Sequence, residues 1–94
     1  LSSKGKFSSP EIRKHLEWIC KVLDGAPSSE FESIEKIKAL IFDYATENGR
    51  GEVLWPLRVS LSGKEKSPDP FTLIFILGKE ESVGRINLAL KNLP

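Results

Sequence analysis

The sequence is poor in the side chains that hold metals or cross-link small folds, since it contains one cysteine, Cys20, and one histidine, His15. One cysteine cannot build a disulfide framework, and one cysteine with one histidine does not make a metal site. A lone cysteine suits a reducing compartment, so a cytoplasmic location is expected. The sequence has no apolar run of membrane-spanning length and no visible signal peptide, so no membrane partner is expected.

Motifs of common catalytic sites are also missing. The chain has no phosphate-binding glycine loop, no HExxH, no CxxC and no G-x-S-x-G. His15 has no nucleophile in a recognisable motif beside it and is interpreted as a packing or surface residue. The acidic pair Glu80 and Glu81 stands where the start of a helix favours negative charge. We therefore expect that this chain catalyses nothing on its own.

The length of 94 residues and a hydrophobic content of 39% are enough for one small domain with one core. The chain begins at Leu1 rather than at methionine, which is typical of a piece of a longer protein. Residues 1–8 are polar and small, so we interpret them as a linker or a cloning remnant. The domain itself is expected to cover residues 9–94.

The net charge of +1 excludes a strongly polybasic protein, but the charge is unevenly distributed. Residues 50–67 carry four basic and two acidic side chains; the basic ones are Arg50, Arg58, Lys64 and Lys66. This mild bias could suit a phosphate backbone, although a bias of this size is more often a solvated surface.

Five consecutive helices are predicted, which makes an all-α bundle. Ser9-Pro10 and Asp69-Pro70 each combine a capping residue with a proline in the first helical turn. Ser29 with Glu32 has the spacing of a capping box, and Gly25 is expected to end the first helix in the left-handed conformation. The expected ranges are 9–25, 29–48, 52–61, 70–77 and 79–92.

The fourth of these segments, FTLIFIL at 71–77, is ambiguous in isolation. Its β-branched and aromatic residues favour a strand by composition. No partner strand is visible, however, and the Asp-Pro start and Gly78 stop both suit a short buried helix, which is the prediction here.

Arg58 interrupts the apolar pattern of the third helix. Val53, Leu54, Leu57 and Leu61 follow the spacing of one helix face, and Arg58 falls on the edge of that face. Its stem can lie on the core while its head reaches water. Alternatively the guanidinium has a partner, because burial of an unpaired charge is costly.

Two further residues of the third helix are notable. Trp55 fits either the core or a stacking surface. Pro56 should bend the helix or lie in its early turns.

Residues 51–82 contain an ordered set of motif positions: Gly51, Val53, Pro56, Leu57, Arg58, Leu61, Ser62 and Gly63, then Ser67, Pro68 and Phe71, then Leu77, Gly78, Lys79 and Glu80. In this set the chain resembles the C-terminal anticodon-binding domain of bacterial glutamyl-tRNA synthetase. The resemblance covers about a third of the chain and departs from the family pattern at Ser60, Pro70 and Thr72, where alanine, a larger apolar residue and an acidic residue are usual.

The resemblance implies that the domain recognises the anticodon loop of tRNA(Glu), whose unpaired bases can be stacked and hydrogen-bonded. Arg58 would offer a charged fork, the prolines would fix the loop, and the lysines would attract the RNA backbone. The implied RNA-binding residues are Trp55, Arg58, Lys64, Lys66, Ser67, Pro68, Asp69 and Pro70.

The same resemblance implies a parent enzyme, a class I glutamate–tRNA ligase that uses ATP and Mg²⁺. The HIGH-like and KMSKS-like signatures of that class are absent here, so this domain is expected to hold no catalytic residue, cofactor or metal. A monomer that works beside the parent's catalytic domain is expected. Two alternatives stay open: a helical protein-interaction module, and the same domain from a synthetase that also charges tRNA(Gln).

Overall fold

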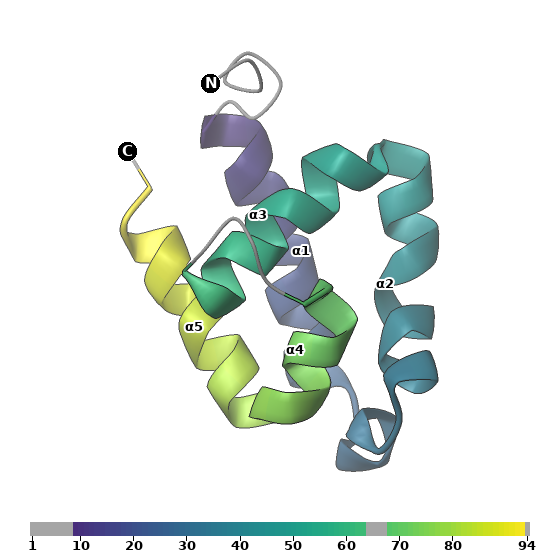
Figure 1. Cartoon of the computed structure of the whole chain (residues 1–94). Coiled ribbons are helices and arrows are strands. Elements are labelled where there is room, and N and C mark those ends of the chain that lie inside the picture. Colours follow the sequence, from purple (N-terminus) through teal and green to yellow (C-terminus); the bar gives the residue numbers. More distant parts are fainter. Residues whose placement is uncertain (1–8, 64–67, 94) are drawn as a thin grey trace.

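The computed structural model describes residues 9–63 and 68–93, which form five α-helices and one short 3-10 helix (Figure 1). No strand occurs in this part of the chain, which confirms the all-α prediction. Residues 1–8, 64–67 and 94 are not described, so the expected linker and the predicted site residues Lys64, Lys66 and Ser67 lie outside the described residues. The elements are α1 (Ser9–Gly25), η2 (Ser28–Phe31), α2 (Ile34–Asn48), α3 (Arg50–Ser62), α4 (Pro70–Leu77) and α5 (Lys79–Lys91).

The third helix, α3, lies at the centre of the bundle. It crosses from the end of α2 toward α5, and it packs against α1, α2, α4 and α5 (Figure 1). Val53, Leu57 and Leu61 of α3 have no exposed surface. The buried apolar side chains that surround them are Leu16, Ile19, Leu23, Ile37, Ile41, Ala45, Phe71, Ile74 and Ile86.

The start of the second helix was predicted wrongly. Residues 28–31 form the 3-10 turn η2, and α2 begins only at Ile34. Its cap is Ser33, whose hydroxyl accepts a hydrogen bond from the amide of Lys36 at 3.2 Å. Ser29 and Glu32 have the spacing of a capping box, but the segment they open closes after one turn, where the Glu32 amide bonds to the Ser29 carbonyl.

Glycines and prolines set the other boundaries, with one correction. Gly63 ends α3 with φ 74° and donates its amide to the Val59 carbonyl at 2.7 Å, as a left-handed cap does. Gly25 ends α1 without a positive φ, contrary to the prediction, because the next amide, that of Ala26, bonds to the Leu23 carbonyl at 3.3 Å. Pro56 lies in the interior of α3, two turns from its start at Arg50, and is buried there.

Distant cations satisfy the carbonyl ends of three helices. The last turns of α1, α2, α3 and α4 contain no basic residue of their own. Lys79 reaches the Ala26 carbonyl just past α1 at 2.7 Å, Arg85 reaches the Leu61 carbonyl of α3 at 2.6 Å, and Arg13 reaches the Leu90 carbonyl of α5 at 3.4 Å. A cation at this end of a helix binds carbonyls that lack an intrahelical partner and complements the helix dipole.

Two serines allow a matched test of these hydrogen-bonding rules. Ser33→Ala should lower the free energy of unfolding by about 1 kcal/mol, because it removes the cap of α2. Ser82→Ala should leave stability unchanged or raise it, because the buried Ser82 hydroxyl has no partner among the described residues and its burial is uncompensated. Urea unfolding of both variants measures the two effects; equal destabilisation by both would contradict this account.

Candidate nucleic-acid interface

Arg58 lies on one flank of α3 and is half-buried. Its Nε atom is buried and has no hydrogen-bond partner, and Arg58 forms no ion pair with any described carboxylate. The stem therefore lies against the protein, as the first alternative predicted, yet part of the charged group has lost water without gaining a partner. Such a group attracts an anion more strongly than a fully hydrated one does.

The described part of the α3–α4 connection serves mainly to start α4. Asp69 caps that helix: its Oδ1 accepts from the Thr72 amide at 3.0 Å and its Oδ2 from the Thr72 hydroxyl at 2.8 Å. Burial acts to raise the pKa of Asp69, but the hydrogen bonds from Thr72 and Phe71 outweigh it and hold the pKa below its usual value. Pro70 is buried in the first turn, whereas Pro68 is exposed.

These positions differ in what they can offer to a ligand. The Asp69 carboxylate is already engaged on both oxygens, and the buried Pro70 ring presents little surface to a base. No hydrogen bond or ion pair joins the Arg58 and Asp69 side chains within the described residues, although α3 and α4 pack against each other. Pro68 and Asp69 are exposed and Arg58 is half-buried, so these three are the described members of the predicted set that reach solvent at this end of the domain.

Trp55 lies elsewhere. It is half-buried and lines an apolar groove of about 300 Å³ between α1, α3 and α5. Neither Arg58 nor Asp69 lines this groove; its other lining residues are Ile12, Leu16, Pro56, Val59, Ser60, Arg85, Leu88, Ala89, Asn92 and Leu93.

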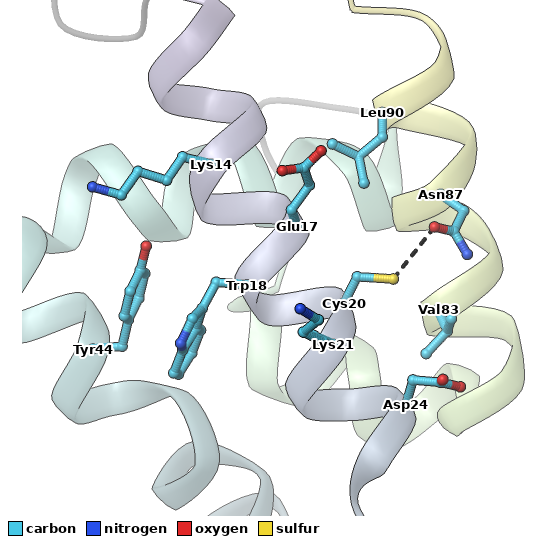
Figure 2. A pocket seen from close by; sticks show the side chains of 10 residues that line it. All are labelled: Lys14, Glu17, Trp18, Cys20, Lys21, Asp24, Tyr44, Val83, Asn87 and Leu90. Carbon is cyan, nitrogen blue, oxygen red and sulfur yellow. Dashed lines mark hydrogen bonds between the residues drawn. The ribbon is translucent and has the colours of Figure 1, made fainter.

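An aromatic cluster at the junction of α1 and α2 escaped the sequence analysis. Trp18 and Tyr44 are stacked, with ring centres 3.9 Å apart and planes within 8° (Figure 2). His15 is buried, and its Nδ1 lies 2.8 Å from the Tyr44 hydroxyl. Burial is the main cause that lowers the pKa of His15, and it also raises the pKa of Tyr44. The i, i+3 spacing of His15 and Trp18 was visible in the sequence, but their partner on α2 was not.

The same cluster borders a shallow depression of about 750 Å³ over α1 (Figure 2). Lys14, Lys21, Glu17 and Asp24 rim it, so charges of both signs alternate there. Figure 2 shows the Cys20 thiol on the α5 side, where it donates to the Asn87 side-chain oxygen at 3.4 Å. Burial raises the pKa of this thiol, which keeps it protonated and weakly nucleophilic.

A second cluster that the sequence analysis missed joins α2 to α3. The Lys38 Nζ lies 4.9 Å from the centre of the Phe42 ring, and the Arg50 guanidinium lies 5.2 Å from the same ring. Both distances are within the range of cation–π attraction. Among the residues that the structure describes, no group of three or more His, Cys, Asp or Glu residues is placed to hold a metal, and no helix there is long and apolar enough to cross a membrane.

Comparisons with known proteins point to one family. The sequence model described as "Anticodon binding domain" matches residues 2–90. Curated proteins named glutamate–tRNA ligase are 37% identical over 90 residues in Flavobacterium psychrophilum and 34% identical over 94 residues in Flavobacterium johnsoniae. These alignments cover 94% and 98% of this chain but only 17% and 18% of the relatives, so the chain spans less than a fifth of their length. No solved structure gives a significant match.

The lone histidine gives a pH prediction. Because the pKa of folded His15 lies below its ordinary value of 6.5, the unfolded chain binds a proton more readily. The free energy of unfolding should therefore fall as the pH drops through about 6.5 and be independent of His15 above it. Thermal unfolding between about pH 7.5 and 5.5 should show this decline, and the slope should vanish in His15→Gln. A similar slope in both proteins would refute the assignment to His15.

Proposed function

The chain belongs to the anticodon-binding domain family, and on this premise we propose that it recognises the anticodon loop of tRNA(Glu) for a glutamate–tRNA ligase. The observation that carries the proposal is the family match over residues 2–90 of a chain that folds as helices alone in its described part. The parent enzyme would join glutamate to tRNA(Glu) with ATP and Mg²⁺ in a separate catalytic domain. We propose that it does so in the cytoplasm and as a monomer.

Arg58 is the proposed reader of the RNA. Anticodon bases are unpaired and can be splayed out, so a guanidinium fork can reach a base edge or a phosphate. The buried stem limits the directions in which this fork can point, and no described residue forms a hydrogen bond or ion pair with the fork, which leaves its terminal nitrogens for a ligand. Both properties support a reading role over simple charge attraction.

The α3–α4 connection is proposed to shape the site. Asp69 and Pro70 fix the start of α4, which anchors one end of the connection, and Pro68 lies exposed next to it. Ser67 would add a hydroxyl, while Lys64 and Lys66 would add attraction to the RNA backbone that weakens with salt. Trp55 fits this proposal less well than Arg58, because its ring lines the separate α1–α3–α5 groove.

The alternative of a protein-interaction module finds less support. Such a module would use an exposed patch at Trp55 or Phe71, but Phe71 is only 6% exposed and belongs to the core. The further question of whether the parent also charges tRNA(Gln) depends on the third anticodon base, and both variants of the enzyme would use this domain in the same way.

The RNA-binding proposal predicts different costs for two substitutions. Arg58→Ala should weaken binding of a tRNA(Glu) anticodon stem-loop by about 1–3 kcal/mol and reduce discrimination against altered anticodons, because a fork reads geometry. Lys64→Ala should cost less and weaken all stem-loops alike, because a flexible ammonium mainly attracts charge. Fluorescence anisotropy measures both, with circular dichroism as the control for folding. Unchanged affinity of folded Arg58→Ala would remove Arg58 from the site.

A separate prediction concerns catalysis. Because the signatures for ATP and glutamate activation are absent from the sequence, the isolated domain should not form glutamyl-adenylate. An ATP–pyrophosphate exchange assay with glutamate and intact tRNA(Glu) should remain at the level of a no-protein control. Exchange above that level by pure protein would contradict the proposal that glutamate is activated in a separate catalytic domain.

A further inference from the structure

Two cations meet over one aromatic ring at the corner between α2 and α3. Lys38 and Phe42 are one turn apart on α2, and Arg50 opens α3 after the single residue Gly49. The distances of 4.9 Å and 5.2 Å to the Phe42 ring centre place both charges within reach of the ring's attraction. Lys38 and Arg50 are exposed, while Phe42 is half-buried. Both cations thus contact the same ring, and neither forms an ion pair with a described carboxylate.

These two cations have no other described task. Arg13, Lys79 and Arg85 bind helix carbonyls, and the ion pairs among the described residues are Arg13–Glu17 and Arg85–Glu81. Lys38 and Arg50 form neither kind of contact within this part of the chain.

None of the acidic residues near the corner in sequence, Glu35, Asp43, Glu47 and Glu52, forms an ion pair with Lys38 or Arg50. Glu35 lies one turn before Lys38 on α2 but forms no ion pair with it. The Glu52 carboxylate lies against Gly49, at the start of α3. An anion drawn to the corner would therefore be held by the two side-chain cations and not by the start of the helix.

The corner lies on the same half of α3 as the proposed reading residue. Arg50, Leu54 and Arg58 follow at intervals of four residues, and because each interval turns about 40° further around the helix, Arg58 lies about 80° around α3 from Arg50. Eight residues at 1.5 Å per residue separate Arg50 from Arg58 by about 12 Å. A charged track of this kind follows a nucleic-acid backbone, because successive phosphates approach successive cations.

We propose that Lys38 and Arg50, held by Phe42, form a second RNA contact that binds a phosphate of the anticodon arm about two helical turns from Arg58. This inference rests on the proposed function and adds a contact that attracts the RNA without reading its sequence. Phosphate contacts position an RNA and carry no base information. Loss of this contact should therefore weaken cognate and altered anticodons equally, in contrast to loss of Arg58.

The test compares two double variants of the 94-residue chain with the same change in net charge. Lys38→Gln/Arg50→Gln removes the corner, and Lys21→Gln/Lys36→Gln removes two exposed lysines elsewhere, of which Lys36 lies on the opposite side of α2 from Lys38. Binding of cognate and altered-anticodon stem-loops is measured over a series of salt concentrations. Circular dichroism melts show that each protein is folded.

The corner variant should reduce the slope of log K against log salt by about 0.7–0.9, the amount expected for the loss of one phosphate contact. The control variant should retain the wild-type slope, and Arg50→Lys should retain it as well, because a point charge suffices for a phosphate. Equal slopes and affinities for the two double variants would overturn the second contact while leaving Arg58 and the proposed function intact. Absence of binding by the wild-type domain would instead overturn the proposed function and this inference together.

Discussion

The burial of α3 on several sides is the constraint on which the rest of the domain depends. Val53, Leu57 and Leu61 are fully buried, and each contributes about 1.5–3 kcal/mol relative to exposure. Their sum is comparable to the whole stability of a small domain, whereas the unpaired Arg58 Nε costs only about 1–3 kcal/mol. The core therefore decides how α3 is rotated, and Arg58, on the edge of the apolar face, is drawn partly inside with it.

The same central position explains how the helix ends are satisfied. A helix in the middle of a bundle ends close to its neighbours, so its last carbonyls can be reached by side chains that are distant in sequence. Arg85 of α5 does this for α3, Lys79 does it beyond α1, and Arg13 of α1 does it for α5. Each contact joins two helices as well as capping one of them. These cations therefore stabilise the fold and are not free to bind a ligand. The cations that remain available to a ligand are those that bind no helix-end carbonyl.

Much of this fold could be predicted from local sequence signals. The errors show that such signals do not predict how far a helix continues or which side chains meet between helices. Asp69-Pro70 and Gly78 identified α4 as a helix although its composition favours a strand, because caps act on the backbone directly. Ser29 was predicted as the start of the second helix, whereas Ser33 caps α2, because a capping-box spacing cannot distinguish one closed turn from a continuing helix. The clusters around Tyr44 and Phe42 arise from packing between helices, and no spacing within one helix reveals them.

For the candidate site, the sequence predicted positions, and the structure describes the surroundings of those that it contains. Pattern alone singled out Arg58 because it breaks an apolar stripe, and the structure adds that its stem is fixed by burial. An ordered side chain loses less entropy when it binds, so a fixed fork is suited to discrimination between bases. Lys38 and Arg50 are exposed, and their contact with Phe42 restrains them less. Under the proposed function, Arg58 on α3 would read the RNA with a half-buried side chain, while Lys38 on α2 and Arg50 on α3 would attract it with exposed side chains.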